Sequence, residues 1–169
     1  MKEVMMVLAL LVSVGIAQGQ VMDEGSSRNE MEPTLRESDY LRKVQSPITP
    51  KAVTEYQVMA VNYDVAKSDL FDGRDALFLV IFRTQKGTIE ASYDWSGDVV
   101  ETIERFRNLM LPRKILLSGM KSHSGWRVIG TNYYVYYLKD TTTRVIYTIQ
   151  ISDGRKKKRI LLNSEGTVL

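Results

Sequence analysis

The chain has 169 residues, of which 44% are hydrophobic and 25% are charged, a composition typical of one folded domain rather than two large ones. It contains no cysteine and one histidine, which excludes disulfides and the usual zinc sites. The formal net charge of +3 is too small to indicate a nucleic-acid partner. We therefore expect no cofactor, no metal ion and no nucleic acid.

Residues 1–19 have the pattern of a secretory signal peptide. Lys2 forms a short positive region, residues 4–16 are almost wholly apolar, and small residues precede a cleavage point before Gln20. This apolar run is shorter than the roughly 20 residues of a membrane-spanning helix, and no later stretch is long enough. We expect an exported protein, periplasmic or extracellular, without a transmembrane segment once the signal is removed.

Residues 20–51 are predicted to be a polar, mobile lead-in to the folded domain. Acidic side chains, the stretch Gly25-Ser26-Ser27 and prolines at positions 33, 47 and 50 all disfavour regular structure here. One short helix is expected at about residues 35–44. The ordered domain should then begin near residue 52.

Residues 52–169 predict an α+β fold, an antiparallel sheet with one or two short helices packed on it. Short runs rich in Val, Ile, Tyr, Phe and Thr alternate with glycine-bearing turns. The apolar run at 76–84 predicts a central strand covered on both faces. Leu111-Pro112 changes the periodicity and predicts a helix at about 112–122. The other strands are expected at 56–66, 88–93, 99–107, 126–138, 144–151 and 157–163.

The two halves of this region resemble each other. Residues 93–100 are similar to residues 162–169, with Gly97 and Gly166 separated by 69 positions, and the same offset lays 76–82 over 145–151. This similarity predicts two copies of a β-rich unit, at 52–108 and 109–169.

Sequence motifs for catalysis are absent. There is no G-x-S-x-G elbow and no phosphate-binding glycine loop, and His123 lies in a polar turn where histidine is common. Asp69, Asp72 and Asp75 cluster near Gly73, but their spacing departs from that of a calcium loop. We therefore expect a protein that is not an enzyme.

Two groups of residues are candidates for binding a partner. The tyrosines around position 135 occupy both faces of one strand, so Tyr134 and Tyr136 are expected to point away from the core, either half-buried or forming a recognition surface. The basic run follows a turn and should alternate between the faces of an exposed or edge strand, where lysine discourages edge pairing. The alternative is a cationic strip for an acidic partner or an anionic surface. The run consists of Arg155, Lys156, Lys157, Lys158 and Arg159.

Residues 87–169 resemble the PepSY-like, beta-lactamase-inhibitor-like family of exported Bacteroidota proteins. The resemblance rests on Y-D-x-x-G-x-V from Tyr93, Leu111-Pro112, Gly125-Trp126, Tyr147-x-Ile149 and Asn163-x-x-Gly166-x-Val168. It implies tandem units of one helix on a four-stranded sheet. This chain departs from that pattern by a polar, proline-broken segment where the first helix should lie.

The resemblance also implies a function without catalysis. We expect a binding or inhibitor-like module that acts on another exported or envelope protein. The alternative is a carrier or sensor that holds a small apolar or anionic ligand between the helix and the sheet.

Overall fold

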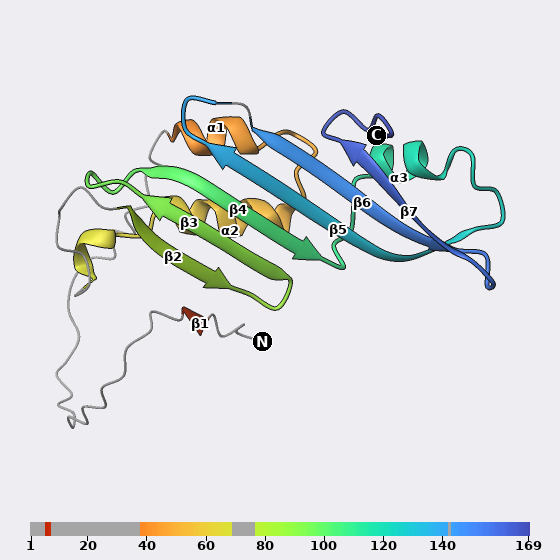
Figure 1. Ribbon diagram of the computed structural model, residues 1–169, viewed down its shortest axis with the longest axis horizontal. Coiled ribbons are helices and arrows are strands. Elements are labelled where there is room, and N and C mark those ends of the chain that lie inside the picture. Colours follow the sequence, from red (N-terminus) through yellow and green to blue (C-terminus); the bar gives the residue numbers. More distant parts are fainter. Residues whose placement is uncertain (1–5, 8–37, 69–76, 142) are drawn as a thin grey trace, which may run out of the picture.

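The computed structural model describes residues 6–7, 38–68, 77–141 and 143–169. It confirms the α+β class, with short helices on an antiparallel sheet (Figure 1). The helices are α1 (Asp39–Val44), α2 (Lys51–Val61), the 3-10 turn η1 (Val65–Lys67) and α3 (Arg113–Met120). The strands are β1 (Met6–Val7), β2 (Phe78–Arg83), β3 (Gly87–Tyr93), β4 (Val99–Arg107), β5 (Arg127–Leu138), β6 (Arg144–Ser152) and β7 (Lys157–Asn163).

The strands follow one another across the sheet in sequence order, and every neighbouring pair is antiparallel. Helix α1 contacts β5, α2 contacts β3 and β4, and α3 contacts β6 and β7. All three helices lie on the same side of the sheet (Figure 1). We call that side the covered face and the other the open face; none of the described helices packs on the open face.

Aromatic rings fill the space between the helices and the covered face. Phe106, Tyr133, Tyr147 and Leu162 lie directly opposite one another on four successive strands, and all four are fully buried. The ring centroids of Tyr133 and Tyr147 are 4.9 Å apart. Because buried rings of this size each remove a large apolar area from water, this row anchors the core.

The folded domain begins before the predicted boundary at residue 52. Helix α1 lies within the short helix expected at 35–44, and it buries Tyr40, Leu41 and Val44. The prediction of an ordered domain starting near 52 is therefore wrong, because the apolar spacing in this short polar segment forms one helical stripe. Residues 20–37 lie outside the described residues.

The strand expected at 56–66 is also wrong. Helix α2 and the η1 turn occupy this segment, and the buried residues Val53, Gln57, Ala60 and Val61 recur at helical spacing. Pro50 immediately precedes the helix, where its missing N–H costs nothing. Pro47 and Pro50 thus lie between α1 and α2 and interrupt neither helix.

Strand β2 lies near one edge of the sheet, next to β1, and is not the central strand that its apolar run predicted. Its side chains are not buried on both faces, because Leu79 points to the open face and is 57% exposed. A continuous apolar run indicates burial on both faces only where a second layer exists. The helix at 112–122 and the strands after it are confirmed by α3, β5, β6 and β7.

Each predicted repeat contains one helix and three strands in the described residues, namely α2 with β2–β4 and α3 with β5–β7. The two similar turns have the same geometry. Asp94 Oδ1 accepts hydrogen bonds from the N–H groups of Ser96 and Asp98, and Asn163 Oδ1 accepts from those of Glu165 and Thr167. Gly97 and Gly166 both have positive φ, at 81° and 88°. Of the predicted signal peptide, only β1 lies within the described residues.

Candidate binding surface

Strand β5 divides its tyrosines between the two faces, as predicted. Tyr133 and Tyr137 are fully buried on the covered face, while Tyr134 and Tyr136 are 39% and 40% exposed on the open face. Their phenol rings are therefore available to a partner, and tyrosine is enriched in recognition surfaces because it combines a large apolar area with a polar hydroxyl.

The open face continues on either side of these tyrosines. In an antiparallel sheet, residues directly opposite one another point to the same face and lie about 5 Å apart. The row through Tyr136 consists of Ile81, Glu90, Ile103, Tyr136 and Arg144. The row through Tyr134 consists of Arg83, Thr88, Arg105, Tyr134, Ile146 and Asn163. Apolar and basic side chains thus form one continuous surface over β2–β6.

One end of this face is hollowed. A hollow of about 410 Å³ is lined by three arginine residues, Arg83, Arg105 and Arg107, among others, and we call it the arginine hollow. Arg105 forms an ion pair with Glu90, whereas Arg83 and Arg107 pair with no described carboxylate. The wall is completed by polar and aromatic residues that include Thr88, Asn132 and Tyr134.

Gly87 permits the close approach of β3 to β4 beside the hollow. A Cβ atom at this position would lie 2.0 Å from the carbonyl oxygen of Arg105. The sequence did not reveal the hollow, because Arg83 lies far along the chain from Arg105 and Arg107 and only the pairing of β2, β3 and β4 brings it near them.

The basic run does not form a single strip. Lys157 and Arg159 lie opposite Ser152 and Gln150 on the open face, whereas the Lys158 ammonium lies 5.0 Å from the centroid of the Trp126 ring, a cation–π contact. Arg155 and Lys156 belong to the turn before β7. The predicted alternation between faces is confirmed for Lys157, Lys158 and Arg159 on β7, the last strand of the sheet, but not for the two residues in the turn.

The Asp153 side chain fixes that turn. Its Oδ1 accepts hydrogen bonds from the N–H groups of Lys156 and Arg155, and these bonds hold the pKa of Asp153 below its ordinary value. The basic run is therefore held by a rigid turn, with its charges dispersed over two faces and a loop.

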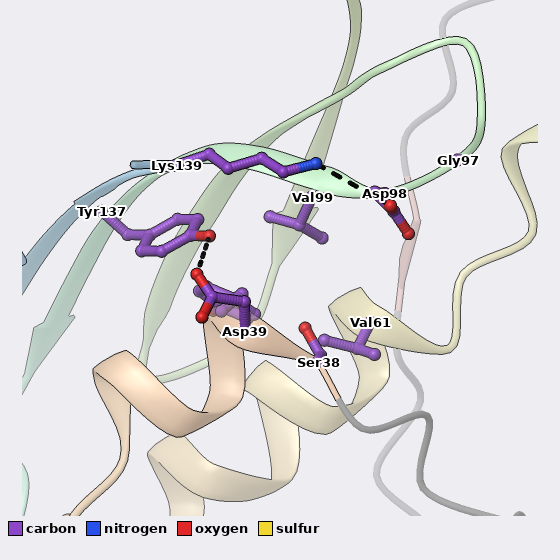
Figure 2. A pocket seen from close by; sticks show the side chains of 9 residues that line it. Ser38, Asp39, Val61, Gly97, Asp98, Val99, Tyr137 and Lys139 are labelled. Carbon is purple, nitrogen blue, oxygen red and sulfur yellow. Dashed lines mark hydrogen bonds and ion pairs between the residues drawn. The ribbon is translucent and has the colours of Figure 1, made fainter. Parts of the chain in front are cut away.

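A second pocket, of about 490 Å³, opens between the start of α1 and the β3–β4 turn (Figure 2). Its charged groups neutralise one another. Lys139 Nζ lies 3.8 Å from a carboxylate oxygen of Asp98 and 3.6 Å from one of Asp94. Asp39 pairs with Arg42 and Lys43, and the hydrogen bond from Lys43 is the main cause that lowers the pKa of Asp39.

Tyr137 closes one side of this second pocket. Its hydroxyl lies 3.4 Å from Asp39 Oδ2, and burial raises its pKa to about 12 (Figure 2). The phenol therefore stays neutral at physiological pH. Because its charged groups are already paired, this pocket should attract a charged ligand less strongly than the arginine hollow does.

A carboxylate is buried beneath the covered face. Glu104 accepts hydrogen bonds from the Tyr40 hydroxyl at 2.7 Å, from Gln57 Nε2 at 2.9 Å and from the Thr102 hydroxyl at 3.1 Å. Burial raises the pKa of Glu104, and the three hydrogen bonds offset part of that rise. The cluster joins α1, α2 and β4 and lies away from solvent, so it fits a structural role.

His123 lies in the turn after α3. Its backbone N–H donates to the Met120 carbonyl at 2.9 Å, and its ring packs edge-on against Trp126 with centroids 5.9 Å apart. Within the described residues no group of three or more His, Asp or Glu side chains could hold a metal ion. The aspartates at 69, 72 and 75 lie outside those residues.

No protein-family model matches this chain, and no match was found among curated proteins or solved structures. The resemblance to PepSY-like proteins therefore stays a prediction. No described helix is both long enough and apolar enough to cross a membrane.

Proposed function

We propose that this protein is an exported, non-catalytic binding module, inhibitor-like in its action, that attaches to another protein outside the cytoplasm through the open face of its sheet. One observation carries the proposal: Tyr134 and Tyr136 stand about 40% exposed on a sheet face that no described helix covers. Monomeric proteins seldom leave a continuous apolar and aromatic surface uncovered unless it meets a partner.

The composition of the face supports the same reading. Binding energy at protein interfaces concentrates in tyrosine, tryptophan and arginine, and the two open-face tyrosines are flanked by Arg105 and Arg144. Ile103 lies on β4, directly opposite Tyr136, and contributes apolar area at the centre. A small apolar centre with a charged rim is the usual anatomy of a protein–protein interface.

The alternative, a carrier of a small ligand held between helix and sheet, has less support. Buried rings of Tyr40, Phe106, Tyr133 and Tyr147 fill that layer. The space beside Tyr133 and Tyr147 measures about 190 Å³, below the range of about 300–1,000 Å³ typical of small-molecule sites. The 490 Å³ pocket is large enough, yet its charges are compensated within the protein.

The test is crosslinking of the tagged protein in its own host, followed by purification and identification of bound proteins. We expect one stoichiometric partner that is lost when Tyr134 and Tyr136 are both replaced by Ala. Trp95→Ala is the matched control, because Trp95 is 69% exposed but lies in the β3–β4 turn, off the open face. A partner retained by the tyrosine variant, or none in repeated experiments, would overturn the proposal.

A further inference from the structure

We infer that the arginine hollow is a carboxylate-binding subsite, and that it selects partners presenting clustered Asp or Glu side chains at that end of the open face. This inference rests on the proposed function, since it specifies the chemistry of the surface that the open face would meet. It concerns Arg83, Arg105 and Arg107, which the sequence does not single out.

The first argument is the charge balance of the open face. A third cross-strand row of the open face consists of Leu79, Ser92, Glu101 and Leu138. Glu90 and Glu101 are the acidic side chains on the three rows, and Glu90 is already paired with Arg105. The basic side chains on the same face outnumber them. They include Arg83, Arg105, Arg107, Arg144, Lys157 and Arg159. The six basic and two acidic side chains named here leave this one face with a positive charge at least as large as that of the whole chain, whose formal net charge is +3.

The second argument is the geometry of the hollow. Arg83 lies on the same cross-strand row as Arg105, with Thr88 between them, and Arg107 follows two residues along β4. Three arginine residues therefore line one concavity of about 410 Å³. A guanidinium binds a carboxylate in a planar, bidentate manner, which makes arginine the side chain best suited to this task.

The third argument is the unequal pairing of the three arginines. Glu90 restrains Arg105, whereas Arg83 and Arg107 have no ion pair with a described residue. Guanidinium groups without an ion pair in the described part of the chain leave positive charge uncompensated, so an incoming carboxylate gains attraction from Arg83 and Arg107. Thr88, Asn132 and Tyr134 add polar side chains within the hollow that a carboxylate oxygen or a backbone group of the partner could meet.

The occupant we commit to is an acidic segment of a protein, not a lipid or a free anion. The hollow is continuous with the tyrosine surface through Tyr134, which lines it. A partner that covers Tyr134 and Tyr136 would therefore place neighbouring side chains over the hollow. Such a partner needs carboxylates at one end of its interface and apolar side chains at the centre.

A fluorescent octaglutamate peptide serves as the probe, with octalysine as the negative control. We expect it to bind the full exported chain at low salt and to weaken at physiological salt, because exposed charges are screened there. Replacement of Arg83 and Arg107 by Gln should weaken binding by about tenfold, the effect of two partly exposed charge contacts. Arg113→Gln with Lys114→Gln is the matched control, because these exposed residues lie on α3, behind the covered face.

A variant with the opposite expected effect sharpens the test. Glu90→Gln frees Arg105, so the octaglutamate affinity should rise by about twofold to fivefold. Glu165→Gln, which changes the net charge equally in the exposed turn after β7, should have a smaller effect. Amide shifts in a nuclear magnetic resonance titration should centre on Thr88, Arg105 and Asn132.

Several results would overturn the inference. Equal losses in the two double variants would show that only net charge matters. Binding of phosphate or of phosphatidylglycerol vesicles without binding of octaglutamate would assign the hollow to another anion. If the crosslinked partner is lost from the tyrosine variant but retained in full by the Arg83 and Arg107 variant, the open face binds a protein and the carboxylate subsite is wrong.

Discussion

Successive side chains of each strand point to opposite faces of this sheet, and the two faces differ in whether their charged side chains have partners within the described part of the chain. On the covered face, Glu104 is fully buried and is surrounded by three hydrogen-bond donors. On the open face, Arg83 and Arg107 have no ion pair with a described residue. A charge that serves the fold is satisfied within the chain, whereas a charge left unpaired at the surface is available to a partner. Substitutions on the covered face should therefore lower stability, whereas substitutions on the open face should lower partner binding.

The largest effect is expected at Glu104. Replacement by Ala leaves the donors of Tyr40, Gln57 and Thr102 buried without an acceptor, so unfolding should become easier by about 3–5 kcal/mol. Chemical denaturation measures this loss. Glu104→Gln is the control, because it keeps the shape and an acceptor, and its cost should be far smaller. Equal losses for both variants would contradict the role of hydrogen bonding.

Gly87 should come next. A methyl group at this position meets the Arg105 carbonyl and the Phe106 backbone, so Gly87→Ala should cost about 1–3 kcal/mol. Gly154→Ala serves as a contrast, because no atom lies within 4 Å of a Cβ there and only its positive φ opposes the change. A Gly87→Ala protein as stable as the wild type would show that β3 and β4 can separate at this point.

The pH dependence of stability tests the buried carboxylate directly. The pKa of Glu104 in the folded protein is raised above its ordinary value of 4.5, so the folded state holds this proton more tightly than the unfolded state. Its stabilising effect is complete below about pH 4.5 and is lost as the pH rises through the folded pKa. The stability of the wild type relative to Glu104→Gln should therefore fall over that window; a difference that rises with pH would contradict the account.

Two buried tyrosines should respond differently to loss of the hydroxyl. Tyr93 donates to the Ala60 carbonyl at 2.7 Å, so Tyr93→Phe should cost about 1 kcal/mol. The Tyr133 hydroxyl is buried and makes no hydrogen bond of normal geometry to a described residue, although burial raises its pKa and the Thr49 and Tyr147 hydroxyls also influence it, so Tyr133→Phe should cost less than Tyr93→Phe. Thermal unfolding of the two variants measures both changes, and a larger loss of stability in Tyr133→Phe than in Tyr93→Phe would contradict the prediction.

The smallest effect on stability is expected on the open face. Because Tyr134 and Tyr136 are about 40% exposed, their replacement by Ser should change the free energy of unfolding by no more than about 1 kcal/mol. The same replacement should abolish capture of the partner. Stability would then depend on the covered face and binding on the open face; a strong loss of stability in this variant would contradict that separation.

The sequence predicted the strands of the second half well, since their alternation and glycine turns are local signals. The bounds of β7 match the expectation, and α3 begins beside Pro112 as Leu111-Pro112 indicated. The first half was harder, because the alternation from Met59 to Val65 overlapped with a helical spacing that only the packing of α2 on β3 and β4 decides. In a short segment whose apolar residues fit both the strand and the helix period, the local sequence does not distinguish a strand from a helix.

The candidate site was predicted in part. Alternation along β5 correctly assigned Tyr134 and Tyr136 to the face opposite Tyr133. The arginine hollow was missed because Arg83 and Arg105 are 22 positions apart in the chain, and their proximity depends on strand register. Basic residues adjacent in sequence drew the prediction to residues 155–159, which the strand then distributes over two faces.

The most direct test of binding through the open face is site-specific photocrosslinking in the native host. A photoreactive amino acid at position 136 probes the open face, and one at position 117, where Leu117 is 60% exposed on α3, probes the helix side. We predict one discrete protein adduct from position 136 and none from position 117. An adduct from position 117 alone, or equal adducts from both, would contradict the assignment of binding to the open face.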